Sequence, residues 1–224
     1  MCCTRSIAFR HDERMSFSYL ISQKFNGETA TVVVFRKGNR AQNEDKEKIA
    51  VNDQPQTISI TMMPYKPRVP SHLHGKQPSY LIIGGLVFVK LTEPLLIDDF
   101  GEEYEYEAPL DLLNQCFDFE KRHDDDEVII LRQVLASRLT LGYEDCQNMI
   151  LEKLNDTPVH NMIHLSKLIR DNKDDFLKFS LIKGAKREVV LSQENLNTLT
   201  KNICQVNNIS SPHSDDILLY LERE

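Results

Sequence analysis

Apolar residues recur along this chain in two spacings, which predict a mixture of helices and strands. Residues 16–25 carry apolar side chains at a helical spacing. Residues 29–36 and 57–63 are instead rich in β-branched side chains, which is typical of strands. The long polar stretch between these two strands predicts a hairpin loop.

The same two spacings predict further strands and helices in the rest of the chain. Expected strands cover residues 80–92, 128–135, 149–154, 176–182 and 187–192, and expected helices cover residues 108–117, 161–172 and 193–206. Strands and helices do not alternate regularly in this order. The sequence therefore favours an α+β fold with antiparallel sheets, built from small β-rich units with one or two helices each.

The most apolar run of the chain, from Tyr80 to Thr92, contains two adjacent glycines. Its uninterrupted part, from Tyr80 to Val89, is ten residues long before Lys90 interrupts it, whereas a membrane-spanning helix needs about 20 residues. The glycines also lack the lysine and serine or threonine of a phosphate-binding loop. We therefore expect no membrane span and no nucleotide site here.

Two explanations of the glycine pair remain open. In the first, Gly84, Gly85, Leu86, Val87 and Phe88 form a loop whose backbone N–H groups bind the terminal carboxylate of a peptide. A free strand edge beside the loop would then pair with the peptide. In the second, the glycines mark a bulge in a buried strand.

Composition and charge narrow the possible functions. The 27 basic and 34 acidic residues give a net charge of −7, which offers no support for nucleic-acid binding. The five cysteines are scattered and form no Cys-x-x-Cys pair, so neither a zinc site nor a disulfide framework is expected. No targeting signal is visible, and we expect a reducing compartment, cytoplasmic or nuclear by default.

The sequence gives little support for a catalytic site or a metal-binding site. No serine lies in the glycine-flanked context of a nucleophile, so no catalytic residue is predicted. The pairs His72/His74 and His160/His164 have spacings that can bind a metal, but neither has a neighbouring carboxylate or thiol to complete a site. Surface histidines are the favoured interpretation, and we predict no metal and no cofactor.

Three stretches of the chain together resemble a known family. They are "FRHDERMSFSYLISQKFNGETATVVVFRKGN", "PSYLIIGGLVFVKLTEPLL" and "ILRQVLASRLTLGYEDCQNMILEKLNDTPVHNMIHLSKLI". In this order they resemble the C-terminal PDZ region of the plant Do-like (Deg, HtrA-type) serine proteases. The resemblance implies PDZ-like small antiparallel β-barrels or sandwiches with flanking helices, one partial and one complete.

The resemblance also implies a division of the chain. We expect a partial first PDZ-like module over residues 1–65, a proline-rich linker over 66–78, a complete second module over 79–216 and a C-terminal tail over 217–224. Where the family has Asn-Gly in a turn, this chain has Asn155-Asp156. Asp tolerates left-handed backbone geometry better than most residues, so we expect that turn to persist.

Function follows from the resemblance as an expectation. In the family, a trypsin-like domain carries the His/Asp/Ser triad, and no part of it occurs in these 224 residues. We therefore expect a non-catalytic homologue that binds protein C-termini or extended peptides. Gly84–Phe88 would bind the carboxylate, and Met162 and His164 would line the groove. The alternatives are a serine endopeptidase by ancestry, or a regulatory subunit of full-length Deg-type proteases, which occur in plastids, mitochondria and the nucleus.

Overall fold

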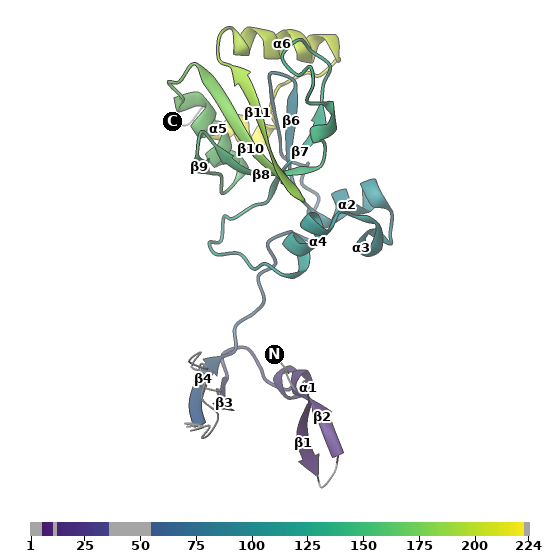
Figure 1. Ribbon diagram of the computed structural model, residues 1–224, viewed down its shortest axis with the longest axis vertical. Coiled ribbons are helices and arrows are strands. Elements are labelled where there is room, and N and C mark those ends of the chain that lie inside the picture. The colour runs from purple at the N-terminus through teal and green to yellow at the C-terminus, as the bar shows by residue number, and fades with distance from the viewer. Residues whose placement is uncertain (1–5, 11–12, 36–54, 222–224) are drawn as a thin grey trace, which may run out of the picture. The chain divides into compact units, whose positions relative to one another are not determined.

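The computed structural model describes residues 6–10, 13–35 and 55–221, and it divides the chain into two units, Met1–Tyr65 and Lys66–Glu224 (Figure 1). The expected hairpin loop falls largely on residues 36–54 and so lies outside the described residues.

The first unit contains two separate pairs of antiparallel strands. Strand β1 (Ser6–Arg10) pairs with β2 (Glu13–Ser16), and the short helix α1 (Phe17–Ser22) follows directly. Strand β3 (Thr29–Phe35) pairs with β4 (Pro55–Thr61) along its whole length. The strand pair β3–β4 agrees with the sequence pattern, whereas β1 and β2 were not expected.

Apolar side chains of the first unit are widely exposed. Val33 on β3 is 53% exposed, and Phe25 is 76% exposed. The apolar residues that are described as buried all come from the second unit. Among the residues whose exposure is described, the first unit therefore contributes none to a hydrophobic core.

The second unit is built on one antiparallel sheet. Its strands lie in the order β11-β10-β8-β7-β6-β5, and a short strand β9 pairs with β8. The strands are β5 (Tyr80–Ile83), β6 (Leu86–Lys90), β7 (Ile129–Val134), β8 (Met149–Leu154), β9 (Thr157–Pro158), β10 (Phe176–Lys183) and β11 (Ala185–Ser192). Strand β5 therefore lies at one edge of the sheet.

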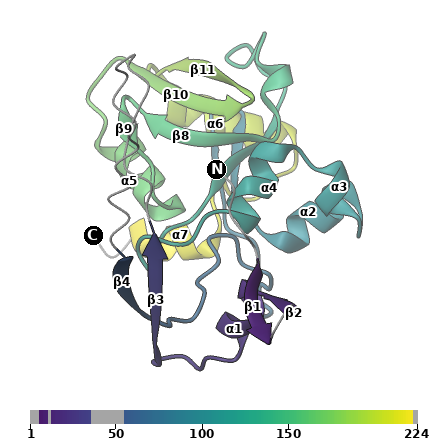
Figure 2. The same cartoon turned by 60° about the horizontal axis from the view of Figure 1, so that its bottom comes forward.

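Helices cover this sheet in two groups. The first is α2 (Glu93–Phe100), α3 (Tyr104–Glu107) and α4 (Leu110–Phe117), which lie together in Figures 1 and 2. The second is α5 (Met162–Asp171), α6 (Leu196–Val206) and α7 (Asp215–Leu221). In the sequence, a 3-10 turn at Glu144–Cys146 lies between the two groups. Helix α7 packs beside α5 (Figure 2).

The sheet separates two hydrophobic cores, and strand β7 contributes side chains to both. Ile129 and Leu131 belong to the main core, where Phe88 and Phe179 stack with ring centres 5.1 Å apart. Ile130 belongs to a second core formed with α2, α3 and α4. Successive side chains of a strand point to opposite faces, so a strand buried on both faces is continuously apolar. This explains the uninterrupted run "VIIL" in the sequence.

The α+β architecture with antiparallel sheets confirms the fold class expected from the sequence. One residue near each end of the second unit is buried in a core. Val69, expected in a linker, is buried in the second core, and Ile217, expected in a tail, is fully buried in the main core. Asn155 and Asp156 have φ angles of 44° and 64°, so the turn does adopt left-handed geometry.

Candidate functional site

The glycine pair forms the two-residue turn between β5 and β6. Gly84 and Gly85 have φ angles of +58° and +100°, and a two-residue turn of type I′ needs positive φ at both positions. A β-carbon on Gly85 would lie 3.0 Å from the carbonyl oxygen of Leu135, so there is little room for a side chain. The Gly84 amide donates to the buried hydroxyl of Thr200 on α6 at 2.8 Å. The glycines therefore close a tight hairpin against α6.

Strand β6 has a sheet neighbour on each side. It pairs with β5 along one edge and with β7 along the other, and Leu86 and Phe88 are fully buried. Because β6 is an interior strand, the free edge expected beside Gly84–Phe88 is not there; the edge strand is β5. A role in peptide binding stays a prediction for Gly84, Gly85, Leu86, Val87 and Phe88. In this structure they would act as part of the β5–β6 hairpin and not as an open loop.

The two expected residues of α5 lie in different surroundings. Met162 is buried in the main core, and its amide donates to a Glu127 carboxylate oxygen at 3.1 Å. His164 lines a separate hollow on α5, together with His160, whose ring lies parallel to it at 5.2 Å. Burial lowers the pKa of His164, and the charges of His160 and Lys167 lower it further. The part of the chain that the structure describes contains no group of three or more residues able to hold a metal.

A different groove lies beside the edge strand. It is a cavity of about 460 Å³ bounded by β5, α5 and α6. Helix α5 contributes Ser166, Ile169 and Arg170, which share one face of the helix because they are three and four positions apart. The cavity wall from β5 and α6 includes Ile83 and Lys201. The groove thus combines apolar walls with two cations.

The chain itself lies along the outer edge of β5. The Ile82 amide donates to the carbonyl oxygen of Pro212 at 2.6 Å, and the Ser214 amide donates to the carbonyl oxygen of Tyr80 at 3.0 Å. Leu81 pairs with His213 in antiparallel register. Pro212, His213 and Leu221 also line the groove. The edge of β5 is therefore able to accept extended backbone, and in this structure it holds a short segment around His213.

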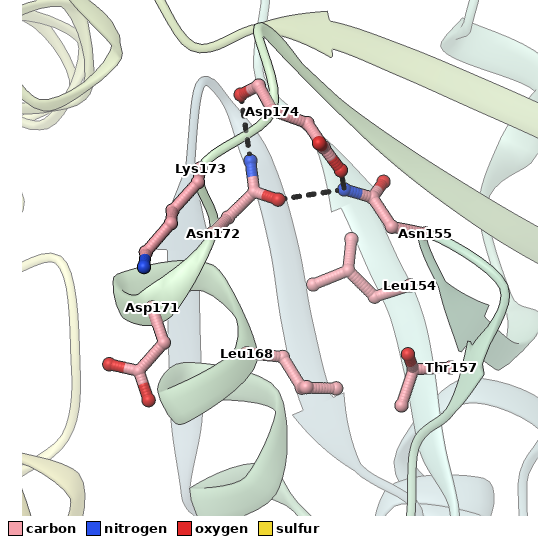
Figure 3. Close-up of a pocket in the computed structure, with 8 residues that line it drawn as sticks. All are labelled: Leu154, Asn155, Thr157, Leu168, Asp171, Asn172, Lys173 and Asp174. Atoms are coloured by element: carbon pink, nitrogen blue, oxygen red, sulfur yellow. Dashed lines mark hydrogen bonds between the residues drawn. The ribbon is translucent and has the colours of Figure 1, made fainter.

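A third hollow, shown in Figure 3, has a structural explanation. Its wall holds Asn155, whose side-chain amide donates to Asn172 at 2.9 Å and to Asp174 at 3.2 Å. The Asn155 side-chain oxygen accepts from the Lys178 amide at 2.7 Å. These bonds fix the left-handed turn at Asn155-Asp156 to the end of α5, which accounts for the polar residues gathered there.

Sequence reasoning missed most of the residues that line the groove. Ile169 and Arg170 lie on the helix that was expected to contribute, but its rotation about its axis was not fixed by the apolar pattern. Lys201 on α6 and Pro212 after it had no local signal, because their place beside β5 depends on contacts between distant segments. The part of the chain described by the structure has no helix both long and apolar enough to cross a membrane.

Comparisons with known proteins agree with this geometry. The family described as "PDZ domain" matches residues 69–216. The chain is 36% identical over 216 residues to "Protease Do-like 2, chloroplastic" of Arabidopsis thaliana. The aligned residues cover 96% of this chain and 32% of that protein. It is 27% identical over 212 residues to "Putative protease Do-like 3, mitochondrial" of the same plant, covering 95% of this chain and 33% of that protein.

A more distant relative comes from a different organism. The "Serine protease DegP homolog" of Plasmodium falciparum (isolate 3D7) is 25% identical over 168 residues, which cover 75% of this chain and 17% of that protein. The chain spans about a third of the length of the plant relatives. The resemblance drawn from the sequence is thereby confirmed: the chain belongs to the PDZ domain family and is a homologue of the Do-like proteases.

Proposed function

We propose that the second unit, Lys66–Glu224, binds extended peptides, including protein C-termini, in the groove between β5 and α5. The peptide adds as a strand to the outer edge of β5 and places alternate side chains in the cavity. The observation that carries this proposal is the edge of β5 itself. Its backbone groups at Tyr80 and Ile82 already pair with an antiparallel segment.

The lining of the groove supports a peptide with an apolar side chain and a carboxylate. Ile83 and Ile169 provide apolar surface next to the strand edge. Arg170 and Lys201 bring two positive charges to the same cavity, although the Arg170 guanidinium also pairs with Asp171 at 3.1 Å. Main-chain hydrogen bonds would supply affinity for any extended peptide, and the side-chain pockets would supply selectivity.

We further propose that these 224 residues bind without cleaving. The relatives are named proteases, but the chain spans about a third of their length and has no serine in the sequence context of a nucleophile. A fluorophosphonate that labels any serine of this chain would contradict this and favour an endopeptidase. Association with a full-length Do-like protease is the alternative partner, and co-purification of the two chains would support it.

Calorimetric titration with a panel of C-terminal peptides tests the groove. Ile169→Asp places a charge in the cavity, and we expect it to weaken binding at least about tenfold. Ile163→Asp is the matched control, because Ile163 lies on the same helix but lines the separate hollow with His164. We expect that variant to bind as the unchanged chain does. Both variants are first compared by urea denaturation, so that a loss of folding is not taken for a loss of binding.

Absence of binding would count against the proposal only when the strand edge is accessible. The titration is therefore repeated with the double variant Ser79→Ala/Asp216→Asn, in which the segment paired to β5 is loosened. If neither form binds any peptide at about 1 mM, the groove is not a peptide site.

A further inference from the structure

The segment Ser211–Leu221 combines three features of a peptide ligand within the chain itself. It pairs with β5 through an antiparallel bridge at His213, it presents the Asp216 carboxylate close to that bridge, and it buries the aliphatic side chain of Ile217. We propose that this segment is a built-in competitor of the groove, so that a peptide binds only when the segment leaves the edge of β5. The inference rests on the proposed function and adds its regulation.

The strand pairing takes up the outward backbone groups of β5. Besides the bonds from Ile82 to Pro212 and from Ser214 to Tyr80, the Tyr80 amide donates to the Ser214 hydroxyl at 3.1 Å. The segment runs antiparallel to β5, with His213 opposite Leu81. An incoming strand needs the same N–H and C=O groups, and each amide hydrogen can be donated fully to only one strand at a time. Binding of a peptide strand and of this segment are therefore mutually exclusive.

A carboxylate follows the paired residues closely. Asp216 accepts a hydrogen bond from the Ser214 hydroxyl and another from the Ser79 hydroxyl, each at 2.5 Å. Ser79 immediately precedes β5, so the carboxylate lies where a strand on this edge leaves the sheet. Charge-assisted hydrogen bonds of this kind are stronger than neutral ones. They hold the segment at the beginning of β5.

An aliphatic anchor completes the segment. Ile217 is fully buried in the main core, and Leu221 lines the groove. Both residues belong to α7, which packs beside α5 (Figure 2). The competing ligand is therefore expected to be an extended peptide that carries a carboxylate and a large aliphatic side chain.

With such a competitor, the apparent affinity of the groove equals its intrinsic affinity multiplied by the fraction of molecules in which the edge is free. Loosening the segment should accordingly strengthen peptide binding, the opposite of what damage to a binding site does. This sign separates the proposal from a purely structural role of α7.

The test uses the full chain and a synthetic peptide with the sequence of residues 209–221 as the probe. The double variant Ser79→Ala/Asp216→Asn removes the bond from the Ser79 hydroxyl and the negative charge that strengthens the bond from the Ser214 hydroxyl, while leaving Ile217 in the core. We expect it to bind the probe at least about tenfold more tightly than the unchanged chain. Asp215→Asn is the matched control: it makes the same change of charge on the exposed neighbouring residue. We expect no gain from it, and a scrambled probe should not bind.

Amide hydrogen exchange gives a readout that does not depend on the variant. In the isotopically labelled, unchanged chain, saturating unlabelled probe should leave the Ile82 amide protected, because the probe replaces Pro212 as its acceptor. The Ser214 amide should lose protection, because its segment is displaced.

The outcomes separate the two proposals. If the probe binds while Ser214 stays protected, or if the double variant binds no more tightly than the unchanged chain, the competitor role is wrong and peptide binding stands. If even the double variant binds neither the probe nor any peptide of the panel, peptide binding is wrong and the competitor role falls with it.

Discussion

The Ile82 amide nitrogen lies 2.6 Å from the carbonyl oxygen of Pro212, so the outer edge of β5 is paired with a segment from near the end of the chain. An unpaired strand edge can pair with other chains and so promotes aggregation. The pairing seen here protects the edge, and it also occupies the position that a peptide strand would take. Stability and binding in the second unit therefore depend on the same short segment.

Ile217 should contribute strongly to the stability of the second unit. Its side chain is fully buried in the main core, so Ile217→Ala leaves a cavity. We expect the free energy of unfolding to fall by about 3 kcal/mol, measured by urea denaturation. Leu219→Ala on the same helix is the control, because that side chain is 53% exposed and its loss should change the stability by at most about 0.5 kcal/mol. Equal effects of the two substitutions would show that α7 is not part of the core.

Gly85 should tolerate a side chain less well than a glycine in open space. Gly85→Ala meets two costs: a φ of +100° and a β-carbon only 3.0 Å from the Leu135 carbonyl oxygen. Gly142 has a φ of +88°, but a β-carbon added there would meet nothing within 4 Å, so Gly142→Ala measures the backbone cost alone. We expect about 1 kcal/mol for Gly142→Ala and about 3 kcal/mol for Gly85→Ala from urea denaturation. A cost at Gly85 no larger than at Gly142 would contradict the close packing of this turn.

The local pattern of the sequence predicted strands better than it predicted their neighbours. The β-branched and apolar runs located β3, β7 and β10, since side-chain alternation and burial are properties of the strand itself. The glycine pair was correctly identified as special, because Gly84 and Gly85 have positive φ. The strand after the glycine pair, β6, is an interior strand because β7 pairs with it. Three helices separate β6 from β7 in the sequence, so the local pattern of β6 did not show this.

The groove escaped prediction for the same reason. The turn at Asn155-Asp156 could be anticipated from residue type alone, since its φ angles are a local property. The pairing of Tyr80 with Ser214 joins distant parts of the chain, and no spacing within either segment signals it. The residues from Ile217 onward, which lie in α7, were therefore expected to form a tail.

Acidification should loosen the segment paired to β5. Burial tends to raise the pKa of Asp216, but hydrogen bonds from Ser214, Ser79 and the Ile217 amide together hold its pKa below the usual 3.8. A carboxyl group whose pKa is lowered by folding stabilises the folded form fully above pH 3.8, and this contribution is lost as the pH falls through the lowered pKa.

Hydrogen exchange of the Ser214 amide measures this loss. We expect its protection to decrease below about pH 3.8 relative to amides of the main core, and the decrease to be absent in Asp216→Asn. Because the exchange chemistry itself varies with pH, protection is compared between the two proteins at each pH. A decrease of the same size in Asp216→Asn would assign the effect to another carboxyl group.

Lys201 should favour peptides that carry a carboxylate. It lines the groove from α6 and is exposed, so its charge acts through water and salt weakens it. With the Ser79→Ala/Asp216→Asn chain as the starting protein, we expect Lys201→Gln to weaken binding of a peptide with a free C-terminus about threefold. The C-terminally amidated form of the same peptide should bind Lys201→Gln and the starting protein alike.

Lys186→Gln provides the control for the loss of a positive charge. Lys186 lies on β11, at the other end of the strand order from β5, and pairs with Glu152 at 3.1 Å. Calorimetric titration at low and at high salt should show an effect of Lys201→Gln that shrinks with salt, and no effect of Lys186→Gln at either concentration. If Lys201→Gln and Lys186→Gln weaken binding equally, the preference comes from the net charge of the protein, and the groove does not recognise the carboxylate through Lys201.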